Sequence, residues 1–323
     1  MKRSSFFAAV LSGLLLAGTA SAATLPGPMV DAAWLHAHRD GVTVLDVRSW
    51  LQGFTAAPKY ESKDGERVLV RAGGHIPGAL LIDAGKVRAE REVRGKMIAG
   101  ELPTREAFQV LMRSAGVNAG EAIVIATPGE TVGQMDEAAR VYWTLKYFGD
   151  DDIAILNGGT AAWLAAGYKV STSAVKAAKG DWVATAERDA LLARFQDVKK
   201  ALADGTQLVD ARTVGQYLGV SKKWSVKVAG HLRGAKNMPV AVHTRTQGPA
   251  QLFLSADEYR NVFRKLGIQP EAGTITYCNT GHLASGAWFV LSELLGVDDV
   301  RLYDGSMLAW TTFGGGDVVG LAE

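Results

Sequence analysis

The chain holds one cysteine, Cys278, in a setting where the backbone can activate a thiol. A β-prone run ends at Tyr277, a small polar loop follows, and an apolar segment with helical character begins near Ser285. A turn from strand to helix directs free N–H groups and a helix N-terminus at whatever the loop holds, which stabilises a thiolate. Cys278 is therefore a candidate nucleophile, and the alternative is a small, inert core residue.

The loop Cys278–Leu283 supplies the groups that would surround this sulfur. We expect its successive N–H groups to point inward as an anion-binding nest, with Gly281 at a position that requires an unusual φ. His282 would supply positive charge, bind a donor or pass a proton, unless it is an exposed loop histidine. Thr280 would donate its hydroxyl to a donor oxygen or stabilise the loop, and we expect Asn279 to be structural. A single cysteine and six histidines without a ligand-pair spacing predict no metal site.

The two halves of the chain repeat four sequence blocks in the same order, which indicates an internal duplication. The polar run Lys59–Arg71 of the first copy has no counterpart of its length in the second, and we interpret it as a surface insertion rather than a lid. The matched blocks are Val44–Trp50 with Leu208–Val214, Gly74–Ala79 with Gly230–Ala235, Pro103–Val117 with Ser255–Ile268, and Asn157–Trp163 with Asp304–Trp310.

Short apolar runs alternate with helical patterns in both copies. This alternation predicts the α/β class, with a small, mostly parallel sheet in each copy that helices cover on both faces. Thr104 and Ser255 precede helical patterns and are expected to be N-caps. The predicted strands are Val42–Val47, Ala122–Ala126 and Ile153–Leu156 in the first copy, and Gln207–Asp210, Thr274–Tyr277 and Val300–Tyr303 in the second.

Two polar motifs recur in both copies and are therefore expected to be structural. His75 and His231 occupy the same position of a Gly-His-x-x-Gly-Ala block, where we expect a hydrogen bond to the turn before a strand. The Asp-x-Arg motifs that end at Arg48 and Arg212 look like ion pairs or turn anchors. Arg212 is also a candidate for the active cleft, because the C-terminal ends of strands line such crevices.

The composition is that of a globular protein of two domains, with 323 residues, 48% of them hydrophobic and 21% charged. A formal net charge of +2 gives no indication of a nucleic-acid partner. Lys2 and Arg3 precede an apolar run, Phe6–Ala17, and the small residues Ala20-Ser21-Ala22. This pattern predicts a cleavable signal peptide over residues 1–22, rather than an uncleaved membrane anchor, and hence a periplasmic protein without membrane attachment.

The Asp-x-Arg strand end, the Gly-His-x-x-Gly-Ala block, the cysteine loop and the Asp-Gly-Ser-x-x-x-Trp block together resemble those of tandem-domain rhodaneses, the thiosulfate/3-mercaptopyruvate sulfurtransferase family. The resemblance covers nearly the whole chain after the predicted signal peptide. It implies two tandem rhodanese-like α/β/α domains, at residues 23–170 and 187–323, with a linker at 171–186. It also implies that the second domain is catalytic and that the first is silent.

The residues of the first copy support its silence independently. Aligning Ala122–Ala126 with Thr274–Cys278 places Ala126 where the thiol would be. The segment that follows is longer and contains Pro128, which has no N–H to donate. Without a sulfur, this copy is expected to form a wall of the cleft and to bury a domain interface.

Resemblance to this family implies sulfurtransfer in two displacements, without a cofactor. Cys278 takes a sulfane sulfur from a donor as a persulfide, and cyanide, a small thiol or a protein acceptor then removes it. Thiosulfate is the expected donor, by its frequency in the family, and 3-mercaptopyruvate is the alternative. The chain departs from typical members at three positions. Thr280 and Gln216 stand where cations would meet an anionic donor, and Leu283 replaces an arginine of related exported members.

Two other functions stay open at this point. The loss of two anion-binding cations favours a periplasmic persulfide carrier, which receives sulfur from one protein and hands it to another without turnover on small donors. The second open function is that of a redox-sensing thiol, or of an inactive relative with a binding role. The intact length of the loop and Gly281 favour an active sulfurtransferase over both.

Overall fold

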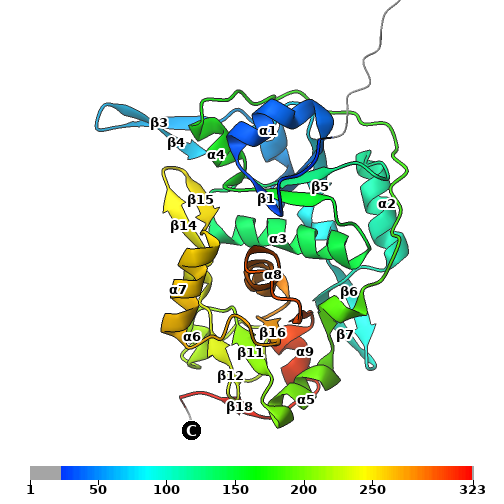
Figure 1. Cartoon of the computed structure of the whole chain (residues 1–323), viewed down its shortest axis with the longest axis vertical. Coiled ribbons are helices and arrows are strands. Elements are labelled where there is room, and N and C mark those ends of the chain that lie inside the picture. The colour runs from blue at the N-terminus through cyan, green and yellow to red at the C-terminus, as the bar shows by residue number, and fades with distance from the viewer. Residues whose placement is uncertain (1–22, 322–323) are drawn as a thin grey trace, which may run out of the picture.

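The computed structural model describes residues 23–321, so the predicted signal peptide lies outside the described residues. Within them the chain forms two α/β units, each on a five-stranded sheet (Figure 1). All neighbouring strands within these two sheets are parallel, which confirms the predicted fold class. The boundaries 23–170, 171–186 and 187–323 stay predictions. No helix among residues 23–321 is both long and apolar enough to cross a membrane.

The first sheet has the strand order β1-β9-β8-β2-β5. Its central strand β8 carries the apolar residues of the run 122–126 and is buried along its whole length. The elements of this half are β1 (Met29–Val30), α1 (Ala32–His38), β2 (Thr43–Arg48), β3 (Lys59–Lys63), β4 (Glu66–Arg71), β5 (Leu80–Asp83), β6 (Ala89–Val93), β7 (Lys96–Glu101), α2 (Arg105–Ala115), β8 (Ile123–Ala126), α3 (Val132–Tyr147), β9 (Ile153–Leu156) and α4 (Gly159–Ala165).

The second sheet has the order β10-β17-β16-β11-β13, with β16 at its centre. Strands β11, β16 and β17 have the predicted bounds. The elements of this half are β10 (Leu192–Ala193), α5 (Phe195–Asp204), β11 (Gln207–Asp210), α6 (Val214–Tyr217), β12 (His231–Leu232), β13 (Lys236–Asn237), β14 (Thr244–Gln247), β15 (Ala250–Phe253), α7 (Ala256–Leu266), β16 (Thr274–Tyr277), α8 (His282–Phe289), β17 (Val300–Tyr303), α9 (Ser306–Thr312) and β18 (Val318–Val319).

Helices α3 and α8 join the two halves. In Figure 1 they lie against one another between the two sheets, α3 on β8 and β9, and α8 on β16 and β17. Tyr142 of α3 packs edge-on against Phe289 of α8 at 5.0 Å between ring centroids, and its hydroxyl donates to Glu293 at 2.7 Å. Since each helix follows the central strand of its sheet after a short loop, this packing brings the two strand ends to one interface.

The recurring motifs have the same structural roles in both halves. The Thr104 and Ser255 hydroxyls accept hydrogen bonds from backbone N–H groups in the first turns of α2 and α7, which confirms both N-caps. Nδ1 of His75 lies 2.8 Å from the carbonyl of Phe54, and that of His231 lies 2.7 Å from the carbonyl of Tyr217. Both imidazoles are therefore structural, as the repeat predicts.

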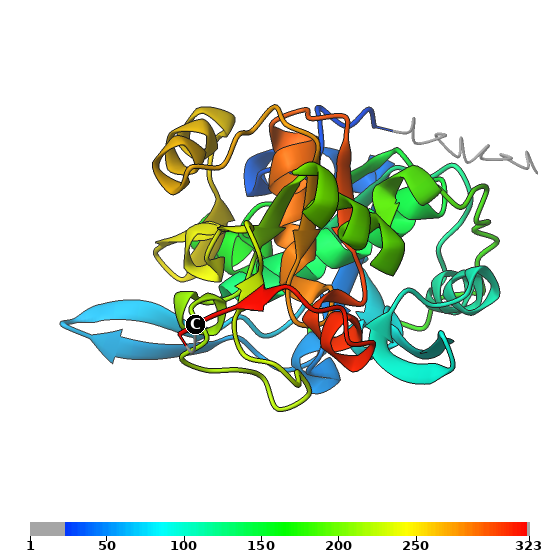
Figure 2. The same cartoon turned by 90° about the horizontal axis from the view of Figure 1, so that it is seen from below.

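Two antiparallel hairpins extend the first half. The predicted insertion forms the β3–β4 hairpin, which projects from the body of the molecule (Figures 1 and 2). A second hairpin, β6–β7, was not indicated by the sequence. It packs against the cysteine loop, since a Cβ on Gly100 would lie 3.0 Å from the carbonyl oxygen of Thr280. This second hairpin therefore belongs to the surroundings of the candidate nucleophile.

Candidate active site

Cys278 follows the last residue of β16 and is buried, with 1% of its surface exposed. Gly281 adopts φ 75° as the N-cap of α8, as its residue type predicts. The helix begins at His282 rather than near Ser285, so His282 and Leu283 belong to its first turn. The Ser285 hydroxyl donates to the carbonyl of Gly281 at 2.8 Å, within the helix. The loop between strand and helix is therefore shorter than predicted.

Ser306 holds this loop from behind. Its Oγ accepts hydrogen bonds from the N–H groups of Cys278 (3.0 Å) and Gly281 (3.1 Å) and donates to the carbonyl of Tyr303 (2.8 Å). These two N–H groups do not point at the sulfur, which corrects the expectation of an uninterrupted nest. Within residues 23–321, the N–H groups of Asn279, Thr280, His282 and Leu283 donate to no protein acceptor, so these amides are available to an anion.

Thr127 occupies the position of Cys278 in the first domain. The last residues of β8 and β16 lie opposite the aspartates of the two Asp-x-Arg motifs, so Ala126 corresponds to the residue before the cysteine. The N–H of Thr160 donates to the carbonyl of Thr127 as the N–H of Met307 does to that of Cys278. The alignment that placed Ala126 there is wrong by one residue. A hydroxyl still stands where the second domain has its thiol.

Cys278 lines a cavity of about 570 Å³ between the two domains. Four further residues of the predicted loop also line it: Asn279, Thr280, His282 and Leu283. The first domain contributes charged side chains of both signs to the same cavity, and Lys223 comes from the second. The charged first-domain residues include Arg71, Arg88, Glu130 and Glu137. The first domain thus forms a wall of the cleft, as expected.

Arg212 and Gln216 lie outside this lining. Arg212 is fully buried and donates to both carboxylate oxygens of Asp210 and to the carbonyl of Gly230 at 2.7 Å. The interpretation of Arg212 as a cleft residue is therefore wrong, because the ion pair holds its guanidinium inside the domain. Gln216 accepts a hydrogen bond from the Asn279 side chain at 3.1 Å, so it supports the loop instead of meeting a donor.

His282 is half-buried and neutral. Its Nε2 donates to the carbonyl of Gly133 in the first domain at 3.0 Å. Burial, followed by the charge of Arg88, lowers the pKa of His282 to about 4. The expectation of a positive charge at this position is wrong at neutral pH, and so is the alternative of an exposed histidine. The side chain joins the active loop to the start of α3.

The cavity contains cations that sequence reasoning missed. Arg88 and Lys223 lie near Thr280, although neither belongs to a repeated block. Ser306 belongs to a repeated block, but the sequence predicts no role for its hydroxyl. Its position soon after the strand that ends at Tyr303 could have indicated that it lies near Cys278, because the ends of neighbouring parallel strands meet at one edge of the sheet.

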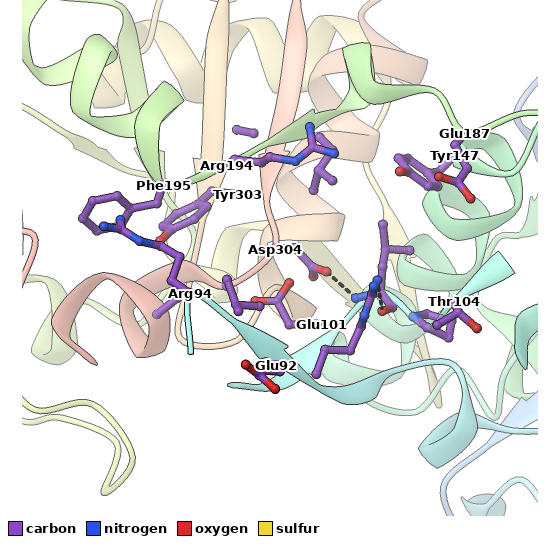
Figure 3. A pocket seen from close by; sticks show the side chains of 18 of the residues that line it. Glu92, Arg94, Glu101, Thr104, Tyr147, Glu187, Arg194, Phe195, Tyr303 and Asp304 are labelled. Atoms are coloured by element: carbon purple, nitrogen blue, oxygen red, sulfur yellow. Dashed lines mark hydrogen bonds between the residues drawn. The ribbon is translucent and has the colours of Figure 1, made fainter. Parts of the chain in front are cut away.

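A larger cavity, of about 880 Å³, lies elsewhere on the domain interface and does not include Cys278 in its lining (Figure 3). Glu101 and Asp304 point toward one another within it. Asp304 accepts from Arg140 at 2.5 Å, and the same nitrogen of Arg140 lies 3.4 Å from the carbonyl of Gly281. This ion pair therefore links the larger cavity to the active loop.

Replacing Glu101 by Gln is expected to flatten the pH dependence of stability. Burial and the adjacent Asp304 raise the pKa of Glu101 from 4.5 to about 8. The folded state therefore holds this proton more tightly than the unfolded state. The resulting stabilisation is complete below pH 4.5 and is lost as the pH rises through 8. Melting temperatures of both proteins at pH 5 and 8.5 measure this, and the Glu101→Gln variant should show the smaller difference.

The Glu106→Gln variant removes an exposed carboxylate from the same cavity and is the control. It should retain the pH dependence of the unmodified protein. Equal pH dependence in the Glu101→Gln variant would contradict the assignment of the proton to Glu101.

Comparison with known proteins agrees with this architecture. The family model described as a rhodanese-like domain matches residues 31–166 and 195–312. The chain is 29% identical to a sulfur carrier protein of Thermus thermophilus, over 86% of this chain and 95% of the relative. It is 28% identical to a thiosulfate sulfurtransferase of Cricetulus griseus, over 84% and 85% of the two chains.

Among solved structures, SseA of Escherichia coli, described as a 3-mercaptopyruvate sulfotransferase with the rhodanese fold, superposes with a TM-score of 0.68. The identity is 27%, and the match covers 87% of this chain and 98% of SseA. Two matched domains, a parallel sheet in each and a cysteine at the end of the central strand of the second lead to one conclusion: the chain belongs to the rhodanese-like family of sulfurtransferases.

Proposed function

We propose that Cys278 takes the sulfane sulfur of thiosulfate and passes it to cyanide or a thiol. The Cys278 thiolate attacks the outer sulfur of thiosulfate, the S–S bond breaks, and sulfite leaves with the bonding electron pair. Cyanide then attacks the outer sulfur of the persulfide and leaves as thiocyanate, which regenerates the thiolate. The observation that supports this proposal is the position of the sole cysteine, at a strand end that lines an interdomain cavity containing cations.

The surrounding groups have separate roles in this reaction. The N–H groups of Asn279 and Thr280 are available to stabilise the negative sulfur. Ser306 fixes the loop and is a positioning residue, since its hydroxyl is taken by backbone groups. His282 orients the loop against the first domain and, being neutral, does not attract the donor.

Intact mass of the protein tests the proposal directly. Incubation with thiosulfate should add one sulfur, about 32 Da, and cyanide should remove it, because the covalent step transfers one atom. The Cys278→Ser variant should gain nothing. If 3-mercaptopyruvate loads the protein and thiosulfate does not, the donor assignment is wrong. If neither loads it, the proposed activity is wrong.

A protein acceptor is a second candidate, favoured by the surface beside the cleft. Trp224 is 89% exposed and Val220 is 65% exposed, and both flank Lys222 and Lys223. Large apolar side chains with this exposure are typical of interaction surfaces. For a persulfide carrier, the mass test would show loading from a protein persulfide but negligible loading from thiosulfate.

We also propose that residues 1–22 direct export and are removed. The proposal is based on the basic start, the apolar run and the small residues before Ala23. The protein recovered from a periplasmic extract should begin at Ala23 when its N-terminus is sequenced. Recovery only from the cytoplasm, with Met1 retained, would contradict export.

A further inference from the structure

Arg88 lies just before β6 in the first domain and contributes to two adjoining spaces. It lines the 570 Å³ cavity with Cys278, and it also lines a shallower groove of about 330 Å³. Lys223 and Thr280 line the same two spaces. The three side chains therefore lie where the cavity meets the groove.

The guanidinium of Arg88 is half-buried and lacks a partner. Within residues 23–321 it takes part in no hydrogen bond or ion pair, although its surroundings are polar. Burial and the charge of Arg140 lower its pKa, and the charge of Cys278 acts in the opposite direction. A partly desolvated cation without a partner is unfavourable, and a bound anion would relieve this.

The carboxylates of the cavity already have partners. Glu130 accepts from the N–H of Ala72 at 2.6 Å, and Glu137 accepts from the hydroxyl of Ser49 at 2.9 Å. Burial, above all, raises the pKa of Glu137, although Arg88 lowers it. Neither carboxylate forms an ion pair with Arg88. Arg88 is therefore not neutralised by an ion pair with either carboxylate of this cavity.

Arg88 lies beside the β6–β7 hairpin. A Cβ on Gly100 would lie 3.7 Å from Nη1 of Arg88 and 3.0 Å from the carbonyl oxygen of Thr280. The guanidinium and the active loop thus lie against the same glycine. Arg88 approaches the loop from the opposite domain, at the third loop residue.

We propose that Arg88, assisted by Lys223, is the subsite that binds the anionic end of the sulfur donor. This inference rests on the proposed function and names its donor class: a small sulfur oxyanion whose oxygens face the planar fork of the guanidinium. The outer sulfur of the donor then faces Cys278, and the departing sulfite remains paired with Arg88 as the S–S bond breaks. The cation comes from the domain that lacks the thiol.

The test measures loading of Cys278 by intact mass at increasing thiosulfate concentrations. In the Arg88→Gln variant, the thiosulfate concentration for half-maximal loading should rise about tenfold or more. This is the effect expected from the loss of one charge-assisted hydrogen bond. The Arg88→Lys variant should fall between, since it keeps the charge without the fork. Discharge of the persulfide by dithiothreitol, a neutral acceptor, should change less than loading. The Arg94→Gln variant removes a charge from the exposed turn of the same hairpin and should load normally.

A second measurement does not depend on sulfurtransfer. Iodoacetate and iodoacetamide have nearly the same shape but differ in charge, and the sole cysteine makes the mass change unambiguous. The alkylation rate of Cys278 by iodoacetate, divided by its rate with iodoacetamide, should fall severalfold in the Arg88→Gln variant. Added salt should lower the same ratio in the unmodified protein. If the unmodified protein never gains sulfur but this ratio falls, the proposed function is wrong and the anion subsite stands. Unchanged loading and an unchanged ratio would overturn the subsite.

Discussion

Replacement of Arg140 by Met is expected to lower the free energy of unfolding by about 3–5 kcal/mol, the cost of removing one partner of a buried ion pair. Arg140 and Asp304 are 1% and 2% exposed, and they join α3 of the first domain to the end of β17 in the second. The truncation leaves the Asp304 carboxylate without its cation. We expect a fall in melting temperature of roughly 10 °C, measurable by circular dichroism.

The matched control is the Arg188→Met variant. Arg188 also donates to both oxygens of an aspartate, Asp151, but the two side chains are 32% and 61% exposed. Exposed pairs contribute about 0–1 kcal/mol, so this variant should lose little stability. Equal effects of the two substitutions would show that burial of the Arg140–Asp304 pair is not what stabilises the domain interface.

Replacement of Gly281 by Ala is expected to reduce sulfur loading of Cys278 at least a hundredfold. Gly281 has φ 75°, a conformation that costs an L-residue about 1–2 kcal/mol. Its Cβ would lie 2.6 Å from Oδ1 of Asp304 and 2.8 Å from the backbone oxygen of the same residue. The loop must therefore move, and its amides would no longer face the sulfur. Loading by intact mass at a fixed thiosulfate concentration measures the loss.

Gly267 provides the control for this substitution. It ends α7 with φ 67°, and a Cβ there would meet no atom within 4 Å. The Gly267→Ala variant should therefore carry a similar conformational cost and load sulfur normally. Normal loading by the Gly281→Ala variant would mean that the loop tolerates displacement, and that its geometry does not limit the reaction.

The sequence predicted the fold well where local pattern and repetition agree. Strands β9, β11, β16 and β17 have the predicted bounds, because short apolar runs between polar turns leave little choice of register. The α/β class and the duplication were likewise visible in the order of the blocks. The start of α8 was predicted three residues late, near Ser285. The sequence does not show that Gly281 is the N-cap, so Leu283 and its neighbours were assigned to the loop.

The candidate site was only half predictable. Cys278 and its loop are local in sequence, so their residue types indicate their chemistry. Arg88 reaches the loop from nearly two hundred residues away, next to a hairpin that interrupts the repeated pattern. His243 belongs to none of the repeated blocks, yet its Nδ1 lies 2.9 Å from Asp136 of the other domain, with both side chains fully buried. Contacts of this kind depend on the packing of α3 against α8, which no local pattern encodes.

The contact between α3 and α8 has a consequence for the ancestry of the chain. A duplicated gene begins with two interchangeable copies, each able to survive without the other. Here α3 has become buried around polar residues such as Asp136 and Arg140, whose partners lie in the second copy. Neither copy can then be inherited without the other, because recombination that separated them would leave unpaired charges on both. The first copy has Thr127 where the second has its thiol, and it is nevertheless still required by the second copy.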